Sequence, residues 1–178
     1  MTETILETER LILRQWRESD IDDYAAMCAD PDVMEFLTGS VMSRMEAWRH
    51  MAFLIGHWSL RGFGHWAVEE KATGKLIGRI GFLEPIDFPG FEIGWTLAPA
   101  SWGKRYANEG ATAALNWAFQ TLDKTEVISL IRPGNVNSIK VAERLGETYQ
   151  GEVEVMGSRV LKYGMSRQRW FEICGAVV

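Results

Sequence analysis

Residues 91–122 constrain the fold of this chain most, because they join a strand pattern to a helix pattern through a short basic loop. Apolar residues alternate with other residues from position 91 to 97, which is the period of a half-buried strand. From Ala107 onward, small and apolar residues recur at the spacing of an amphipathic helix. Lys104 and Arg105 lie directly before the expected helix start. Since a helix N-terminus presents unpaired N–H donors and a partial positive charge, this segment predicts a site for a phosphate-bearing cofactor.

Length, composition and charge narrow the class of protein. With 178 residues, 47% of them hydrophobic, the chain is long enough to bury a core, and we expect a single domain over residues 1–178. The formal net charge of -5 argues against a nucleic-acid partner, which favours a basic surface. An acidic chain suits a cationic or amine substrate.

The sequence lacks the patterns of disulfide-bonded, metal-binding and membrane proteins. Cys28 and Cys174 are the only cysteines, and the histidines at 50, 57 and 65 do not cluster, so we expect neither a disulfide framework nor a metal site. The N-terminus has no signal-peptide pattern, and no apolar run approaches the ~20 residues of a membrane span. We therefore expect a cytoplasmic protein without a membrane partner.

Other patterns predict strands interspersed with helices, which indicates a mixed α/β sheet. We expect a helix from Ser19 that breaks at residues 30–32, a helix opened by a capping box at Ser43, and a helix that ends before Gly146. Residues 170–178 support no interpretation beyond a packing segment. The further expected strands are residues 6–15, 63–70, 75–83, 126–131, 149–155 and 159–166.

Three motifs of other protein classes are misplaced, incomplete or absent in this sequence. Residues 62–67, GFGHWA, match a G-x-G-x-x-A pattern but precede a strand, whereas the dinucleotide fingerprint opens a helix after a strand. Residues 103–105 lack both the leading glycine and the following Ser/Thr of a Walker loop. The chain contains no G-x-S-x-G nucleophile elbow of a hydrolase.

Two segments in a fixed order carry a specific resemblance. FEIGWTLAPASWGKRYANEGATAALNWAF, followed by SLIRPGNVNSIKVAERLG, resembles the GNAT superfamily of N-acetyltransferases. The chain looks most like the RimJ/RimL-like branch of ribosomal-protein acetyltransferases, and TERLILR at residues 8–14 is typical of that branch. The resemblance implies an α/β (α+β) fold with a mixed, mostly antiparallel central sheet, flanked by helices and splayed between its fourth and fifth strands. It also implies acetyl-CoA as the co-substrate.

The resemblance implies which residues hold coenzyme A. The loop of residues 103–108 is expected to cradle the pyrophosphate with backbone N–H groups, and Asn135 is expected to hold the pantetheine arm. The family pattern is Arg/Gln-x-x-Gly-x-Gly/Ala, and this chain has Trp102 first and Arg105 in place of the central glycine. Glycine permits a positive φ there, whereas the Arg105 guanidinium offers a direct phosphate contact. The alternative for Arg105 is a loop with weakened affinity for the cofactor. The expected cofactor-binding residues are Thr96, Leu97, Ala98, Gly103, Lys104, Arg105, Tyr106, Ala107, Asn108 and Asn135.

A direct transfer mechanism also follows from the resemblance. The amine attacks the thioester carbonyl, and a backbone N–H near Leu97 or Ala98 stabilises the developing oxyanion. Glu92, on the polar side of its strand, is the expected general base and acts through water. The alternative for Glu92 is a solvated strand glutamate.

Ser138 is the expected acid that protonates the departing thiolate. Its alternative is an ordinary first-turn helix residue that bonds to the backbone. Tyr149 and Tyr106 are the alternative acids, and we expect Tyr106 to lie buried beneath the loop.

The acceptor is an amine, and its basicity ranks the options. An α-amino group with a pKa of about 7.7–8.0 is partly unprotonated near neutral pH, whereas a lysine-like amine with a pKa of about 10.4 is almost fully protonated. This difference and the branch resemblance favour a protein N-terminus over a small-molecule amine. We expect residues 34–37 and the helix from Ser43 to wall the acceptor side. A non-catalytic acetyl-CoA-binding module, an acyltransferase for longer acyl-CoA and a homodimer are left open.

Overall fold

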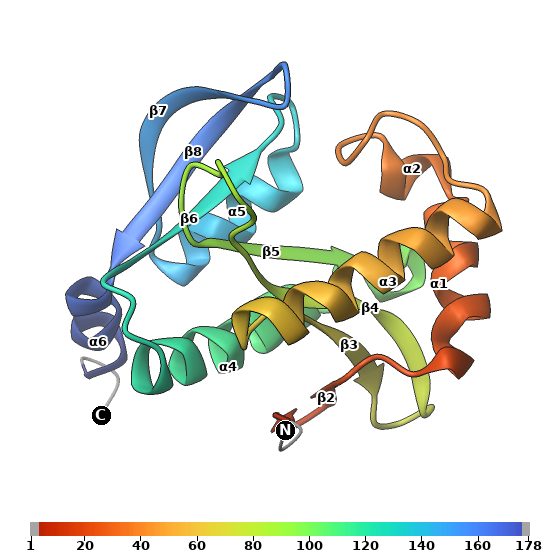
Figure 1. Ribbon diagram of the computed structural model, residues 1–178. Helices are drawn as coiled ribbons and strands as arrows, with labels where there is room; N and C mark the ends of the chain where they lie inside the picture. The colour runs from red at the N-terminus through yellow and green to blue at the C-terminus, as the bar shows by residue number, and fades with distance from the viewer. Residues whose placement is uncertain (1–3, 176–178) are drawn as a thin grey trace.

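The computed structural model describes residues 4–175 and arranges them around one eight-stranded sheet (Figure 1). The strand order is β1-β2-β3-β4-β5-β6-β8-β7, and all neighbours are antiparallel except the parallel pair β5 and β6. The predicted mixed, mostly antiparallel sheet is therefore confirmed. The strands are β1 (Leu6–Glu7), β2 (Leu11–Arg14), β3 (His65–Glu70), β4 (Lys75–Leu83), β5 (Glu92–Leu97), β6 (Glu126–Ile131), β7 (Thr148–Val155) and β8 (Ser158–Ser166).

The α-helices begin and end at residues suited to helix termini. Ser43 and Glu46 form the predicted capping box, in which each side chain accepts a hydrogen bond from the backbone N–H of the other residue. Gly146 ends α5 in the left-handed conformation, with φ 95°. The helices are α1 (Ile21–Cys28), α2 (Pro31–Met34), α3 (Arg44–Arg61), α4 (Tyr106–Thr121), α5 (Val136–Leu145) and α6 (Arg167–Gly175). Over residues 4–175, no helix is long and apolar enough to cross a membrane.

The single strand expected at residues 6–15 is instead the short hairpin β1–β2, in which Leu6 pairs with Leu13. The carboxylate of Glu109, on α4, fixes the intervening turn by accepting hydrogen bonds from the Arg10 backbone N–H at 2.9 Å and the Arg10 guanidinium at 2.7 Å. A local pattern cannot reveal this break, because Glu109 lies 99 positions further along the chain. Because the first expected strand is two strands, the later strands are numbered one higher. The predicted fourth and fifth strands are therefore β5 and β6.

The helix expected from Ser19 begins with a 3₁₀ turn, Glu18–Asp20, and continues as α1. Asp20 is buried and binds the Arg14 guanidinium of β2 through two hydrogen bonds of 2.8 and 2.9 Å. Arg14 also binds the Glu69 carboxylate of β3 at 2.8 Å. This ion-pair network ties the start of α1 to the sheet.

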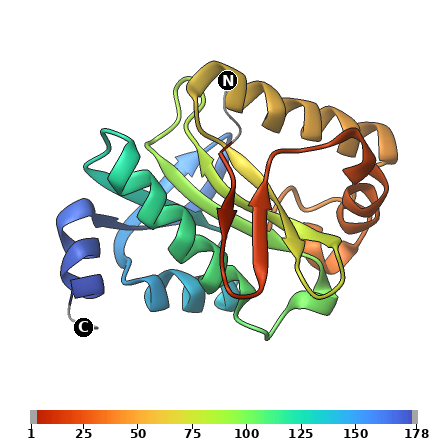
Figure 2. The same ribbon diagram turned by 90° about the horizontal axis from the view of Figure 1, so that it is seen from below.

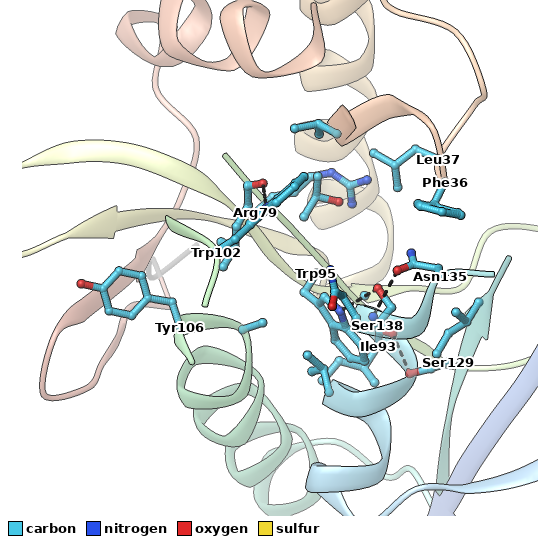
Figure 3. A pocket seen from close by; sticks show the side chains of 18 of the residues that line it. Phe36, Leu37, Arg79, Ile93, Trp95, Trp102, Tyr106, Ser129, Asn135 and Ser138 are labelled. Atoms are coloured by element: carbon cyan, nitrogen blue, oxygen red, sulfur yellow. Dashed lines mark hydrogen bonds between the residues drawn. The ribbon is translucent and has the colours of Figure 1, made fainter. Parts of the chain in front are cut away.

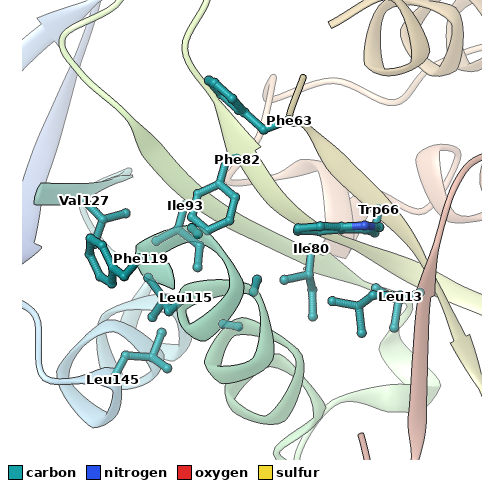
Figure 4. Close-up of a cluster of buried hydrophobic side chains, with 14 of the residues drawn as sticks. Leu13, Phe63, Trp66, Ile80, Phe82, Ile93, Leu115, Phe119, Val127 and Leu145 are labelled. Atoms are coloured by element: carbon teal, nitrogen blue, oxygen red, sulfur yellow. The ribbon is translucent and has the colours of Figure 1, made fainter. Parts of the chain in front are cut away.

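The sheet has a hydrophobic core on each face. Trp66 of β3 belongs to the larger core, which also includes Leu115 of α4 (Figure 4). The next residue, Ala67, belongs to the second core, with residues of α1, α2 and α3. Because successive strand side chains point to opposite faces, α4 covers one face of the sheet and α1–α3 cover the other. Figure 2 shows α3 and α4 on either side of the strands.

The C-terminal segment, for which the sequence suggested only packing, forms α6 up to Gly175. Trp170 is buried, and its indole N–H donates to the Asn116 side-chain oxygen of α4 at 2.9 Å. The rest of that segment, residues 176–178, lies outside the described residues.

Candidate active site

A cleft of about 800 Å³ opens where β5 and β6 separate (Figure 3). Its walls come from β5, β6, α2, the loop before α4 and the first turns of α4 and α5. Ala98 and Lys104 were predicted for this site but do not line the cleft. The predicted residues that do line it are Glu92, Thr96, Leu97, Gly103, Arg105, Tyr106, Ala107, Asn108, Asn135 and Ser138.

β5 and β6 pair only at one end, which confirms the predicted splay. The single pair in register is Glu92 with Ile128, and the Ile128 N–H donates to the Phe91 carbonyl at 2.9 Å. Beyond this pair, the edge of β5 faces the cleft. Backbone groups on such an edge need hydrogen-bond partners, and an extended ligand can supply them as an added strand does.

The ladder between β4 and β5 determines which β5 N–H groups face the cleft. The Ala98 N–H donates to the Ile77 carbonyl at 2.8 Å, toward β4. Because N–H groups alternate between the two edges of a strand, those of Trp95 and Leu97 point toward β6. Of the two oxyanion donors suggested by the sequence, Ala98 is therefore already engaged, and Leu97 faces the cleft.

The loop before α4 has the geometry of an anion site at a helix N-terminus. No side chain within residues 4–175 caps the first turn of α4, so its N–H groups are available to an anion. Gly103 and Arg105 both have left-handed backbones, with φ 74° and 63°. Arg105 thus takes the conformation for which the family uses glycine, at a cost of about 1–2 kcal/mol. Its side chain is exposed beside the same turn.

Two aromatic side chains anchor this loop to the sheet. The indole N–H of Trp102 donates to the Leu97 carbonyl at 2.7 Å. Tyr106 is buried, as expected, and its hydroxyl donates to the Glu70 carboxylate of β3 at 2.7 Å. Lys104 lies beside the Tyr106 ring, 3.9 Å from the Glu70 carboxylate. Because Glu70 engages the Tyr106 hydroxyl, Tyr106 anchors the loop and is a poor candidate for the acid.

The first turn of α5 places Ser138 against β5. The side-chain oxygen of Asn135 caps the helix by accepting the Ser138 N–H at 3.1 Å. The Ser138 hydroxyl oxygen accepts the indole N–H of Trp95 at 3.3 Å. A hydroxyl that accepts one bond keeps its own proton to donate, so Ser138 retains the proton that an acid needs. Tyr149, the other alternative acid, is 54% exposed and does not line the cleft.

Glu92 is a half-buried carboxylic acid on the cleft wall, unlike a solvated strand glutamate. Burial raises the pKa of Glu92 to about 7, although the charge of Arg79 and a backbone hydrogen bond from Leu130 both lower it. A pKa near neutrality is the property that suits a general base at physiological pH.

A second buried carboxyl, Glu147, is coupled to Glu92 and was missed from the sequence. Burial raises the pKa of Glu147 to about 8, and the charge of Glu92 also raises it. The Ser129 hydroxyl lies 3.0 Å from the Glu147 carboxyl and 3.2 Å from the Ile93 carbonyl. That hydroxyl has one proton, so it donates to one of these two oxygens at a time, and its bond to Glu147 lowers the pKa of that carboxyl against the effect of burial. The available signal was an acidic residue placed directly after the helix stop.

The acceptor side of the cleft differs from the prediction in one wall. Of the predicted residues 34–37, residues 35–37 line it, whereas Met34 is buried and does not. The predicted break at residues 30–32 is the start of α2, which begins at Pro31. The expectation for the helix from Ser43 was wrong, because α3 packs against α1 and contributes no residue to the cleft. His65 of β3 and Arg79 of β4 line the cleft and were missed. An arginine within an otherwise apolar strand was the available signal.

Comparison with known proteins identifies the family. Residues 10–148 match the family described as Acetyltransferase (GNAT) domain. The chain is 31% identical over 169 residues to the uncharacterized protein YkkB of Bacillus subtilis, which covers 90% of this chain and 94% of that protein. It is 30% identical over 148 residues to the uncharacterized N-acetyltransferase p20 of Bacillus licheniformis, covering 82% of this chain and 83% of p20. The acetyltransferase structure from Agrobacterium tumefaciens is 31% identical with a TM-score of 0.83, covering 93% and 95% of the two chains.

The chain therefore belongs to the GNAT family of acetyltransferases. It is an N-acetyltransferase, and the family's reaction moves an acetyl group from acetyl-CoA to an amine. Within residues 4–175, no cluster of His, Cys, Asp and Glu side chains could hold a metal ion.

More distant solved structures share the fold alone. The ribosomal-protein-S5-alanine acetyltransferase from Vibrio fischeri is 17% identical with a TM-score of 0.73, covering 94% of this chain and 98% of its own. The spermidine N-acetyltransferase from Vibrio cholerae, in complex with CoA and spermine, is 17% identical with a TM-score of 0.74, covering 92% and 99%. Their names specify different acceptors, so likeness of fold does not select the acceptor of this chain.

Proposed function

We propose that this protein, as one domain over residues 1–178, acetylates the α-amine of a protein N-terminus by direct attack on acetyl-CoA. The observation that carries the proposal is the meeting, in one cleft, of the β5 edge, the uncapped start of α4 and the ionisable Glu92. A small-molecule amine is the second candidate, because the cleft is also large enough for one.

The residues of the cleft fit coenzyme A from end to end. The first turn of α4 and the Arg105 guanidinium would bind the pyrophosphate. The edge of β5 would pair with the amide groups of the pantetheine arm, since that edge faces the cleft. Asn135 uses its side-chain oxygen for the helix cap, which leaves its NH₂ group to donate to the same arm.

The same residues divide the proton transfers of a direct reaction. As the amine nitrogen bonds to the thioester carbon, Glu92 accepts the amine proton through a water molecule. The Leu97 N–H donates to the carbonyl oxygen as negative charge develops on it. When the carbon–sulfur bond breaks, Ser138 donates its proton to the sulfur. The proton that Glu92 took from the amine returns to solvent and Ser138 regains one from solvent, so the two transfers balance. A thiol with a pKa of about 8.5 is already a tolerable leaving group, so the acid adds a modest factor.

Ser138→Ala is expected to lower kcat about tenfold, below the usual range for acid–base catalysis, because the thiolate leaves readily. The affinity for acetyl-CoA changes less, since Asn135 caps the helix through the backbone N–H of residue 138, which alanine keeps. Steady-state kinetics measures kcat, and calorimetric titration measures the affinity for acetyl-CoA. Ser19→Ala, at an exposed site outside the cleft, is the matched control. A kcat equal to wild type would contradict the acid assignment.

Arg105→Gly is expected to raise the Kd for acetyl-CoA at least about tenfold, because a hydrogen bond to a charged phosphate is lost. Glycine adopts the observed φ of 63° without strain, so the loop keeps its shape. Arg105→Lys retains the positive charge and is expected to lose less affinity. An unchanged Kd for Arg105→Gly would show that the guanidinium makes no phosphate contact.

The proposal as a whole is tested by titrating the protein with acetyl-CoA, NADH and ATP, and then by assaying peptides with free N-termini and small amines. Selective binding of acetyl-CoA with peptide-dependent thiol release supports it. Binding of acetyl-CoA with no thiol release for any amine would favour a non-catalytic binding module. Faster turnover with a longer acyl-CoA than with acetyl-CoA would favour an acyltransferase for longer acyl groups.

A further inference from the structure

Arg79 places a positive charge on the wall of the cleft. Figure 3 labels Arg79 among the side chains that line the cleft. Arg79 lies on β4, directly opposite Thr96 of β5, and its guanidinium Nη1 is 3.0 Å from His65 Nδ1. A guanidinium only donates hydrogen bonds, so Nδ1 accepts and the proton of the neutral ring is assigned to Nε2. Burial and the Arg79 charge both lower the pKa of His65, which keeps the ring neutral. His65 therefore positions Arg79 without neutralising it.

No carboxylate within residues 4–175 forms an ion pair with Arg79. By contrast Arg14, a buried arginine of β2, binds two carboxylates. Glu92 is near enough for Arg79 to lower its pKa, but the two side chains do not pair. A half-buried cation without a counter-ion is unfavourable, so its retention in the cleft suggests that a ligand supplies the anion.

Thr96 supplies a second polar group with no partner. Its side chain is 8% exposed, and its hydroxyl forms no hydrogen bond within the described residues. Thr96 and Arg79 both line the main cleft and a second cavity of about 40 Å³. Because Arg79 and Thr96 are directly paired across the two strands, their side chains leave the same face of the sheet, with Cβ atoms about 4.5–5.5 Å apart. Within the described residues, the Thr96 hydroxyl therefore lacks a group that accepts its hydrogen bond, and Arg79 lacks an anionic acceptor.

The exposed charges around the cleft are of both signs. Asp32 and Glu35, at and after α2, would attract a polyamine, whereas the exposed cations Arg105, Lys140 and Arg144 line the side formed by the α4 loop and α5. Water and salt screen charges at such exposed positions, whereas Arg79 acts from a half-buried position where screening is weaker. Arg79 therefore acts on a group inside the cleft more strongly than Asp32 and Glu35 do.

We propose that Arg79 and Thr96 bind a carboxylate carried by the acceptor, so that the substrate is an amine with a carboxylate on the same molecule. The inference rests on the proposed function, because it assigns the chemistry of the acceptor in that site. The carboxylate is either the α-carboxylate of an amino acid or an acidic side chain of a peptide. In the first case Glu92 and Arg79 receive the two ends of a zwitterion, which explains why the two side chains line one cleft without pairing.

The test compares acceptors that differ only in the carboxylate. The pairs are alanine against alaninamide, and the dipeptide amide Ala-Glu-NH₂ against Ala-Gln-NH₂. We expect kcat/KM to be at least about tenfold higher for the acid in one pair, mainly through KM. The pair that shows the preference identifies the source of the carboxylate. The ratio of kcat/KM for acid over amide is expected to fall to near unity in Arg79→Gln and to be reduced in Thr96→Val. Arg61→Gln, at the exposed end of α3, is the control and is expected to keep the wild-type ratio.

A binding measurement separates this inference from the proposed function. The complex of protein and CoA is titrated with the acetylated products, N-acetylalanine and N-acetyl-Ala-Glu-NH₂, and with their amides. Tighter binding of the acid that is lost in Arg79→Gln supports the anion site even when no amine is acetylated. Turnover with equal kcat/KM for acid and amide, and equal binding of both products, would overturn the anion site and leave the acetyltransferase proposal intact. A preference for spermidine over every acid would also overturn it.

Discussion

Glu92→Gln is expected to lower kcat/KM for amine acetylation by about 10²–10⁴-fold at pH 8, because glutamine keeps the shape of the side chain but accepts no proton. Burial raises the pKa of Glu92 to about 7, so the wild-type carboxyl is protonated and inactive as a base below that pH. The wild-type kcat/KM therefore rises with pH through about 7, and ionisation of the amine, with a pKa of about 7.7–8.0, extends the rise. The pH profile of Glu92→Gln is expected to show only the ionisation of the amine.

A pH profile of kcat/KM for both proteins, from about pH 5.5 to 9, measures this effect. Glu126→Gln is the matched control, because it makes the same change at an exposed position on the neighbouring strand β6. A Glu92→Gln profile that keeps the inflection near 7 would assign that ionisation to another group. Glu147, whose pKa is raised to about 8 and which is coupled to Glu92, would then be the group to replace next.

Arg14→Met is expected to lower the free energy of unfolding by about 3–5 kcal/mol, the largest stability effect that we anticipate for one substitution. Arg14 and Asp20 are 5% and 4% exposed, and the guanidinium also binds Glu69. Removing the cation leaves two carboxylates without their counter-charge, one of them fully buried. Urea denaturation followed by far-ultraviolet circular dichroism measures the change.

Arg44→Met is the control for this prediction. Arg44 binds Asp22 of α1 at 2.6 Å, but their side chains are 64% and 81% exposed. An exposed pair of this kind contributes less than about 1 kcal/mol. If Arg14→Met were no more destabilising than Arg44→Met, the network between β2, β3 and α1 would not stabilise the fold as we describe.

Much of the fold follows from local sequence patterns. The alternation before residue 97 and the helical spacing after it gave β5 and α4, and the capping box at Ser43 gave the start of α3. Local patterns did not predict the break between β1 and β2, which Glu109 of α4 determines. They also did not predict the placement of α3, which its packing against α1 determines. Both depend on contacts between segments that are distant in the sequence, which a local pattern does not contain.

The site was predictable where a motif fixes a residue and not where a neighbour does. The family resemblance predicted Glu92, Ser138 and the α4 loop as site residues, and they line one cleft. The sequence did not reveal His65, Arg79 and Glu147 as site residues, because their roles in the site depend on contacts with residues of other elements. The Arg79–Thr96 pairing is set by the register of β4 and β5, and the raised pKa of Glu92 comes from its burial. Neither register nor burial is readable from one strand alone.

The measurement that tests the central claim most directly is a product assay with acetyl-CoA and peptides that have free N-termini, including the Ala-Glu and Ala-Gln pair. Thiol release and peptide mass are followed together for wild type and Glu92→Gln. The account predicts one acetyl group on the peptide N-terminus per thiol released, with Glu92→Gln slower by about 10²-fold or more. Acetyl-CoA binding in the cleft with no acetylated peptide or small amine, or wild-type turnover by Glu92→Gln, would contradict it.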